Sequence, residues 1–89
     1  MIRGNVTAYG SELGHDGIPS PYHSYMVWAS ELTGLPDLAV ASIVSFTNGE
    51  QANRQVSADS ERAAFEKAVA MLRSLPENRD LQFALHEDQ

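Results

Sequence analysis

Residues 60–75 predict an amphipathic helix, and this helix constrains the fold more than any other part of the sequence. Apolar residues recur at spacings of three and four along SERAAFEKAVAMLRSL and form one broad stripe: Ala64, Phe65, Ala68, Val69, Met71, Leu72 and Leu75. Asp59 or Ser60 can cap the first turn, and Pro76 ends the helix. The remainder of the chain must therefore supply an apolar surface that this stripe can cover.

Four stretches of the sequence predict β-strands. Residues 2–9 alternate, with small and apolar side chains on one side and polar side chains on the other. Residues 38–47 and 52–58 flank Asn48-Gly49, a dipeptide typical of tight hairpin turns, and we expect Val56 and Ala58 to face the core. Residues 80–86 alternate again and direct three apolar side chains inward: Leu81, Phe83 and Leu85.

Residues 10–20 and 21–33 complete the chain. The first stretch, GSELGHDGIPS, contains three glycines and a proline and predicts a long loop. In the second, Ser20 and Pro21 suit the start of a helix and Gly34 suits its end, so we expect a helix. A strand is the alternative, because the Tyr-Met-Val-Trp run favours β structure. The helix would bury one stripe: Tyr22, Tyr25, Met26, Ala29 and Leu32.

The order strand, helix, strand, strand, helix, strand predicts a ferredoxin-like βαββαβ fold over residues 1–89 as one domain. In this α+β fold, two helices cover one face of an antiparallel sheet. If residues 21–33 form a strand, the alternative is about five antiparallel strands with one helix. Either way one face of the sheet stays open, and its expected residues are mostly amides and hydroxyls: Arg3, Asn5, Thr7, Tyr9, Asn53, Gln55, Ser57, Gln82 and His86.

Composition and motifs exclude several functions. The chain has no cysteine, which excludes disulfides, thiol nucleophiles and cysteine metal sites. Six basic and twelve acidic residues give a net charge of -6, which disfavours nucleic-acid binding. The segment ANRQVSA lacks the aromatic residues of an RNA-recognition strand, and no nucleotide-binding loop or hydrolase elbow occurs, so we expect no cofactor. No signal-peptide-like or membrane-spanning apolar run is present, so we expect a cytoplasmic protein.

Histidines are the remaining candidates for chemistry. His15 and Asp16 lie on the expected loop, and His23 follows eight positions after His15. A folded loop could bring the three together around a metal ion or as an acid–base pair, and Tyr9 would join them around a pocket between the loop and the sheet. This pattern is the basis of an alternative function, a small homodimeric enzyme or a ligand- or metal-binding domain.

The layout of strand, Asn48-Gly49 turn, strand, Asp59-Ser60, helix and Leu75-Pro76 resembles some small phage-encoded inhibitors, anti-CRISPR proteins among them. That resemblance implies a non-catalytic inhibitor of a nucleic-acid-handling complex.

We therefore expect a small acidic protein that binds a basic protein partner, without catalysis and without direct contact to nucleic acid or membrane; self-association as a homodimer stays open. The contact residues would come from the sheet face and the acidic surface: Arg3, Asn5, Thr7, Tyr9, Glu12, Asp16, Glu50, Asn53 and Gln55.

Overall fold

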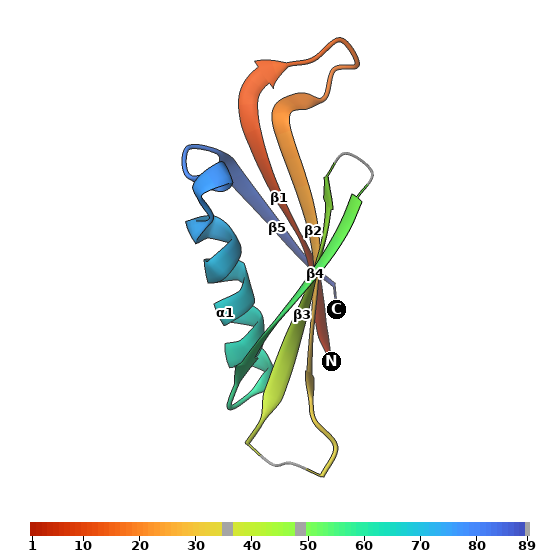
Figure 1. Cartoon of the computed structure of the whole chain (residues 1–89), viewed down its shortest axis with the longest axis vertical. Helices are drawn as coiled ribbons and strands as arrows, with labels where there is room; N and C mark the ends of the chain where they lie inside the picture. Colours follow the sequence, from red (N-terminus) through yellow and green to blue (C-terminus); the bar gives the residue numbers. More distant parts are fainter. Residues whose placement is uncertain (35–36, 48–49, 89) are drawn as a thin grey trace.

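The protein is an antiparallel sheet with a helix packed on one of its faces (Figure 1). The computed structural model describes residues 1–34, 37–47 and 50–88, without the side chains of residues 46, 47 and 50–52. In chain order, the elements are β1 (Ile2–Leu13), β2 (Pro19–Glu31), β3 (Ala39–Thr47), β4 (Glu50–Ala58), α1 (Glu61–Ser74), the 3-10 turn η1 (Pro76–Asn78) and β5 (Gln82–Asp88). Across the sheet the strands lie in the order β4-β3-β2-β1-β5.

The predicted ferredoxin-like βαββαβ fold was wrong, because residues 21–33 belong to a strand rather than to a second helix. Most of this stretch is β2, which pairs with β1 on one side and β3 on the other. The alternative left open by the sequence, antiparallel strands with one helix, is the architecture found in the described residues.

The physical reason is that β2 carries apolar side chains on both faces. Tyr25, Val27 and Ala29 are buried under α1. Tyr22 and Met26 lie on the opposite face, where they are 48% and 37% exposed. A strand that is apolar on both faces has no polar alternation, so its period of two is hidden in the sequence.

The predicted loop over residues 10–20 was also largely wrong. β1 continues to Leu13 and β2 begins at Pro19, so only the turn between them is irregular. A side chain at Gly10 would collide with the backbone oxygen of Ser20, so this glycine marks a close approach of two strands rather than a loop. Residues 10–21, here called the arm, pair only with each other and project beyond the other strands (Figure 1).

The predicted helix and hairpin are confirmed. Ser60 caps α1, because its hydroxyl oxygen accepts a hydrogen bond of 3.1 Å from the backbone N–H of Ala63. β3 and β4 pair antiparallel, while their predicted turn at residues 48–49 lies outside the described part of the chain. None of the helices in that part is both long and apolar enough to cross a membrane.

The core lies between α1 and the sheet face beneath it. The helix buries five side chains of its predicted stripe: Ala64, Phe65, Ala68, Val69 and Leu72. On the sheet, three small residues are fully buried beneath the helix: Ala29, Ala39 and Ala41. Val56, Ala58 and Phe83 pack at the margin of this core, as predicted, but Leu85 is 44% exposed. Small side chains on the sheet allow the helix to approach closely.

Gly4 gives the ring of Phe65 the space that it occupies on the sheet. A Cβ atom at Gly4 would lie 2.9 Å from Cζ of Phe65 and 3.0 Å from the backbone oxygen of His86. We expect Gly4→Ala to lower the free energy of unfolding by about 1–3 kcal/mol, because the added methyl group overpacks the core. Urea denaturation measures this loss.

The matched test of this contact is a double-mutant cycle with Phe65→Leu, which removes part of the ring that the methyl group would strike. The cost of Gly4→Ala should fall by at least about 0.5 kcal/mol in the Phe65→Leu background. Strictly additive costs would show that Gly4 acts through something other than this contact.

Arg62 joins α1 to the edge strand β5. Its guanidinium donates two hydrogen bonds to the carboxylate of Glu87, of 3.0 and 2.7 Å. Hydrogen bonding to Arg62 lowers the pKa of Glu87 below its ordinary value. Because the folded-state pKa is the lower one, the pair stabilises the protein above the unfolded-state pKa, and this contribution is lost as the pH falls through the folded-state pKa.

We expect Glu87→Gln to lower the urea midpoint at neutral pH and to approach the wild type as the pH falls through the lowered folded-state pKa of Glu87, where the wild-type carboxylate becomes protonated. The difference should be small and should shrink with added salt, since the pair is solvent-exposed. Glu12→Gln, on the arm, is the control. If the difference in urea midpoint between Glu87→Gln and the wild type stays constant down to about pH 3, the Arg62–Glu87 pair is not the source of the stabilisation.

Candidate functional site on the open face of the sheet

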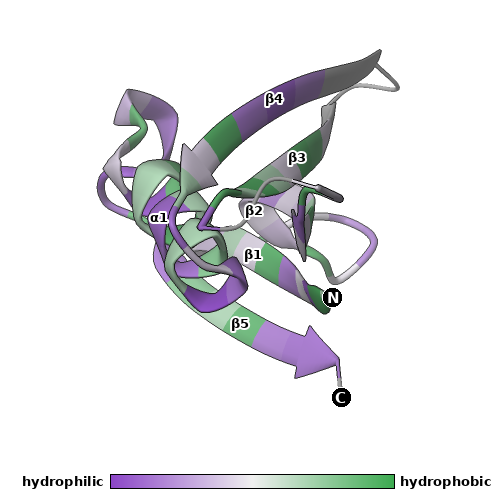
Figure 2. Cartoon of the chain, turned by 90° about the horizontal axis from the view of Figure 1, so that it is seen from below, coloured by the Kyte–Doolittle hydropathy of each residue, from purple (hydrophilic) through white to green (hydrophobic). Residues whose placement is uncertain are grey.

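The sheet face turned away from α1, here called the open face, is not covered by any described element. Figure 2 shows α1 on one side of the sheet and no helix on the other. On this face the register places Tyr9 beside Tyr22, and it places Met26 beside Val44. Together these strands carry what we call the apolar band: Tyr9, Tyr22, Met26, Trp28, Val40 and Val44.

The apolar band consists of side chains that are enriched at protein interfaces. Tyrosine, tryptophan and methionine offer a large contact area and adapt to a partner's shape. Met26 and Tyr22 are among the large hydrophobic side chains most exposed on the sheet, and Trp28, Val40 and Val44 are half-buried by their neighbours. Ser24 and Ser42 interrupt the band, which is otherwise an exposed and half-buried apolar surface and a candidate interaction site.

Charge is divided unevenly between the two layers. Residues 60–81, which contain α1 and η1, hold four acidic and four basic residues and have no net charge. The remaining residues hold eight acidic and two basic residues, so they carry the whole net charge of -6. The net negative charge therefore belongs to the sheet and its connecting segments, and its field would attract a positively charged surface, while on the open face itself the register places Asp88 beside Arg3.

Most of the predicted contact residues lie where strand alternation places them. By register, the open face includes Arg3, Asn5, Thr7 and Tyr9 of β1, Asn53, Gln55 and Ser57 of β4, and Gln82 and His86 of β5. Glu12 and Asp16 lie on the arm, away from the apolar band. Glu50 begins β4, but its side chain is outside the described part of the chain. The role of these residues in binding stays a prediction.

The residues at the centre of the open face were not predicted from the sequence. Tyr22, Met26 and Trp28 come from β2, which was predicted as a helix. The available signal for this strand was the β-favouring run Tyr-Met-Val-Trp at residues 25–28.

The structure does not bring the three candidate metal or acid–base residues together. His15 and Asp16 lie at the turn of the arm, where Asp16 accepts a hydrogen bond of 3.0 Å from the backbone N–H of Ile18. His23 lies on β2 opposite Ala8, on the face that packs against α1. Within the described residues, no group of three His, Asp or Glu side chains is arranged to hold a metal ion.

His23 instead belongs to a network around Asn78, a fully buried residue of η1 that sequence reasoning missed. The side-chain nitrogen of Asn78 donates to the carbonyl of Leu72 (2.9 Å) and to the hydroxyl of Tyr25 (3.0 Å). A carbonyl accepts only, so this contact fixes which end of the amide is nitrogen. The amide oxygen therefore faces Nδ1 of His23, at 2.8 Å, and Nδ1 must carry the proton.

We expect neutral His23 to be the Nδ1-protonated tautomer, which ¹⁵N NMR of the imidazole nitrogens distinguishes directly. Asn78→Ala should abolish this preference and lower the free energy of unfolding by about 1–3 kcal/mol, because it leaves buried polar groups without a partner. Asn5→Ala, at an exposed position, is the control and should change neither the tautomer of His23 nor the free energy of unfolding. An Nε2-protonated His23 would overturn this description of the network.

No protein-family model, curated protein or solved structure matches the chain.

Proposed function

We propose that the protein is a non-catalytic binding protein whose open face docks on a basic surface of another protein. The observation that carries this proposal is the apolar band on the uncovered face of the sheet, in a protein whose net charge of -6 is carried entirely by residues outside 60–81. The apolar band would supply the contact area of the interface. The net negative charge would favour a basic partner over other apolar surfaces.

The two contributions act at different stages of binding. Acidic side chains steer a basic partner over distances of about 8–10 Å at physiological salt, and they mainly raise the association rate. Buried aromatic and methionine side chains mainly set the dissociation rate, since the central residues of an interface hold most of its binding energy. Binding should therefore depend on salt without being abolished by it.

Surfaces that bind nucleic acid are strongly basic, because they must neutralise phosphates. The narrower form of the proposal is that this protein masks such a surface and so inhibits a nucleic-acid-handling complex. The layout shared with phage-encoded inhibitors supports this form, and competition with nucleic acid tests it.

The test compares two variants with the same charge change on opposite sides of the sheet. Met26→Lys places a cation in the apolar band, whereas Leu85→Lys places one on the α1 side, at a residue of similar exposure (37% and 44%). Tagged wild type and both variants are used to capture partners from host lysate, and the affinity of the captured protein is then measured. Met26→Lys should weaken binding at least tenfold, which corresponds to about 1.4 kcal/mol, and Leu85→Lys should not.

Support requires that the captured protein is basic and that heparin or DNA displaces it. Binding that survives Met26→Lys, or that is lost equally in both variants, would refute the open face as the docking site. A concentration-dependent dimer that Met26→Lys dissociates, in the absence of any other partner, would assign the open face to a second copy of the chain.

A further inference from the structure

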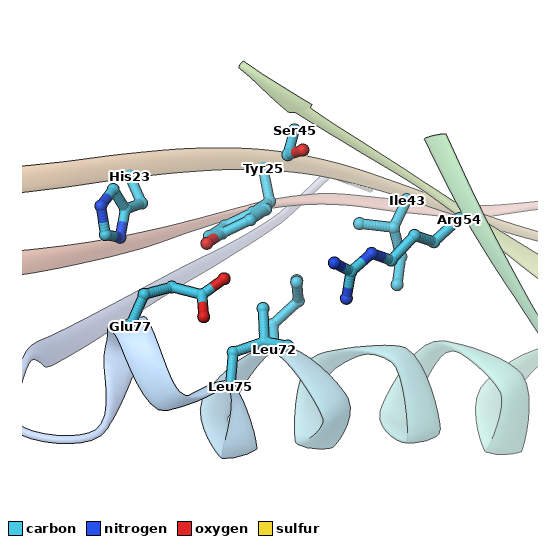
Figure 3. A pocket seen from close by; sticks show the side chains of 8 residues that line it. All are labelled: His23, Tyr25, Ile43, Ser45, Arg54, Leu72, Leu75 and Glu77. Carbon is cyan, nitrogen blue, oxygen red and sulfur yellow. The ribbon is translucent and has the colours of Figure 1, made fainter. Parts of the chain in front are cut away.

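A pocket of about 250 Å³ opens on the other side of the sheet, between its α1-facing surface and the end of α1 (Figure 3). Its apolar walls come from Ile43 of β3 and from Leu72 and Leu75 at the end of the helix. Pockets for drug-sized ligands are usually about 300–1,000 Å³, so this one suits a smaller molecule. It lies on the face opposite the apolar band.

The pocket contains one positive and one negative side chain that do not neutralise each other. Arg54 enters from β4 and Glu77 from η1, and Figure 3 shows their charged groups directed into the pocket from opposite ends, with Leu72 between them. Among the described residues, the ion pairs within 4 Å involve neither Arg54 nor Glu77. Both charges are therefore available to a ligand.

The end of the pocket near Glu77 has a fixed polar wall. Tyr25 and His23 stand at this end (Figure 3), and both are held by the buried Asn78. Because Nδ1 of His23 donates to Asn78, its Nε2 is an acceptor in the neutral ring. The Tyr25 oxygen keeps one lone pair after accepting from Asn78. This end therefore offers hydrogen-bond acceptors, whereas the Arg54 end offers donors.

We propose that this pocket binds a free α-amino acid with an apolar side chain. The ligand carboxylate would pair with the guanidinium of Arg54, a geometry that Arg serves through two parallel hydrogen bonds. The ligand ammonium would face the acceptors at the Glu77 end, and its side chain would contact the leucines and Ile43. Three features of the pocket support this class of ligand: its size, its apolar walls and its two opposite charges.

The experiment uses three probes of nearly the same shape: L-leucine, 4-methylpentanoate, which lacks the ammonium, and 3-methylbutylamine, which lacks the carboxylate. Binding to the full chain is followed by NMR shifts of the backbone amides of Tyr25, Leu72 and Glu77, and by calorimetry. L-leucine should bind at least tenfold more tightly than either single-charge probe. No amide shift up to about 10 mM L-leucine, which corresponds to a binding free energy near 3 kcal/mol, would overturn the proposal.

Two variants separate the two charges. Arg54→Gln should weaken the binding of L-leucine and of 4-methylpentanoate at least tenfold and leave the binding of 3-methylbutylamine unchanged. Glu77→Gln should weaken the binding of L-leucine and of 3-methylbutylamine and leave the binding of 4-methylpentanoate unchanged. Arg3→Gln and Glu12→Gln, outside the pocket, are the matched controls for charge and should not change binding. Equal effects of both pocket variants on all three probes would refute the assigned orientation.

The pocket and the open face lie on opposite sides of the sheet, so these outcomes do not depend on the proposed protein partner. Met26→Lys should leave L-leucine binding unchanged, and Arg54→Gln should leave partner capture unchanged.

Discussion

The close packing of α1 on an alanine- and glycine-rich sheet face is the constraint on which the other features depend. Ala29, Ala39 and Ala41 add no bulk beyond Cβ, and Gly4 leaves space for the ring of Phe65. The helix therefore buries its apolar stripe against a surface on which these small residues lie beside the larger Val6, Val27 and Ile43. Because a single helix covers a single face, the apolar side chains on the opposite face have no cover within the described chain. The packing that forms the core thus also leaves the open face available.

The sequence predicted the elements that have one buried and one exposed side, and it failed at β2, where both sides are apolar. α1, β1 and β4 show a contrast between apolar and polar positions, whereas β3 is apolar on both faces and was predicted through the Asn48-Gly49 dipeptide that follows it. β2 lies at the centre of the sheet and presents Val27 to the core and Trp28 to the open face. The residues near the ends of this stretch also favoured the wrong prediction of a helix, since Ser20-Pro21 and Gly34 suit the ends of a helix as well as those of a strand. The residue pattern thus hid the strand that contributes most to the candidate site.

Strand alternation also sufficed to place β1 and β4 residues of the open face, but it could not reveal the network around Asn78. Asn78 is separated from His23 by 55 residues and from Tyr25 by 53. The network exists because the last carbonyls of a helix have no partner within the helix. The η1 turn brings Asn78 back to the end of α1, where its side-chain nitrogen donates a hydrogen bond to the carbonyl of Leu72. A local signal for such a contact is lacking in the sequence, since any polar residue after Pro76 would fit the same turn pattern.

The two proposed sites differ in the charge that they would favour in a ligand or a partner. The pocket takes one charge from each layer, Arg54 from β4 and Glu77 from η1, so it would favour a ligand whose own charges are balanced. Residues outside 60–81 carry the net charge of -6, so the partner proposed for the open face would be of opposite sign. Added salt weakens the attraction between exposed charges most strongly and affects a pocket's short contacts less. Partner binding should therefore be the more salt-sensitive of the two, because its charges act at longer range through solvent.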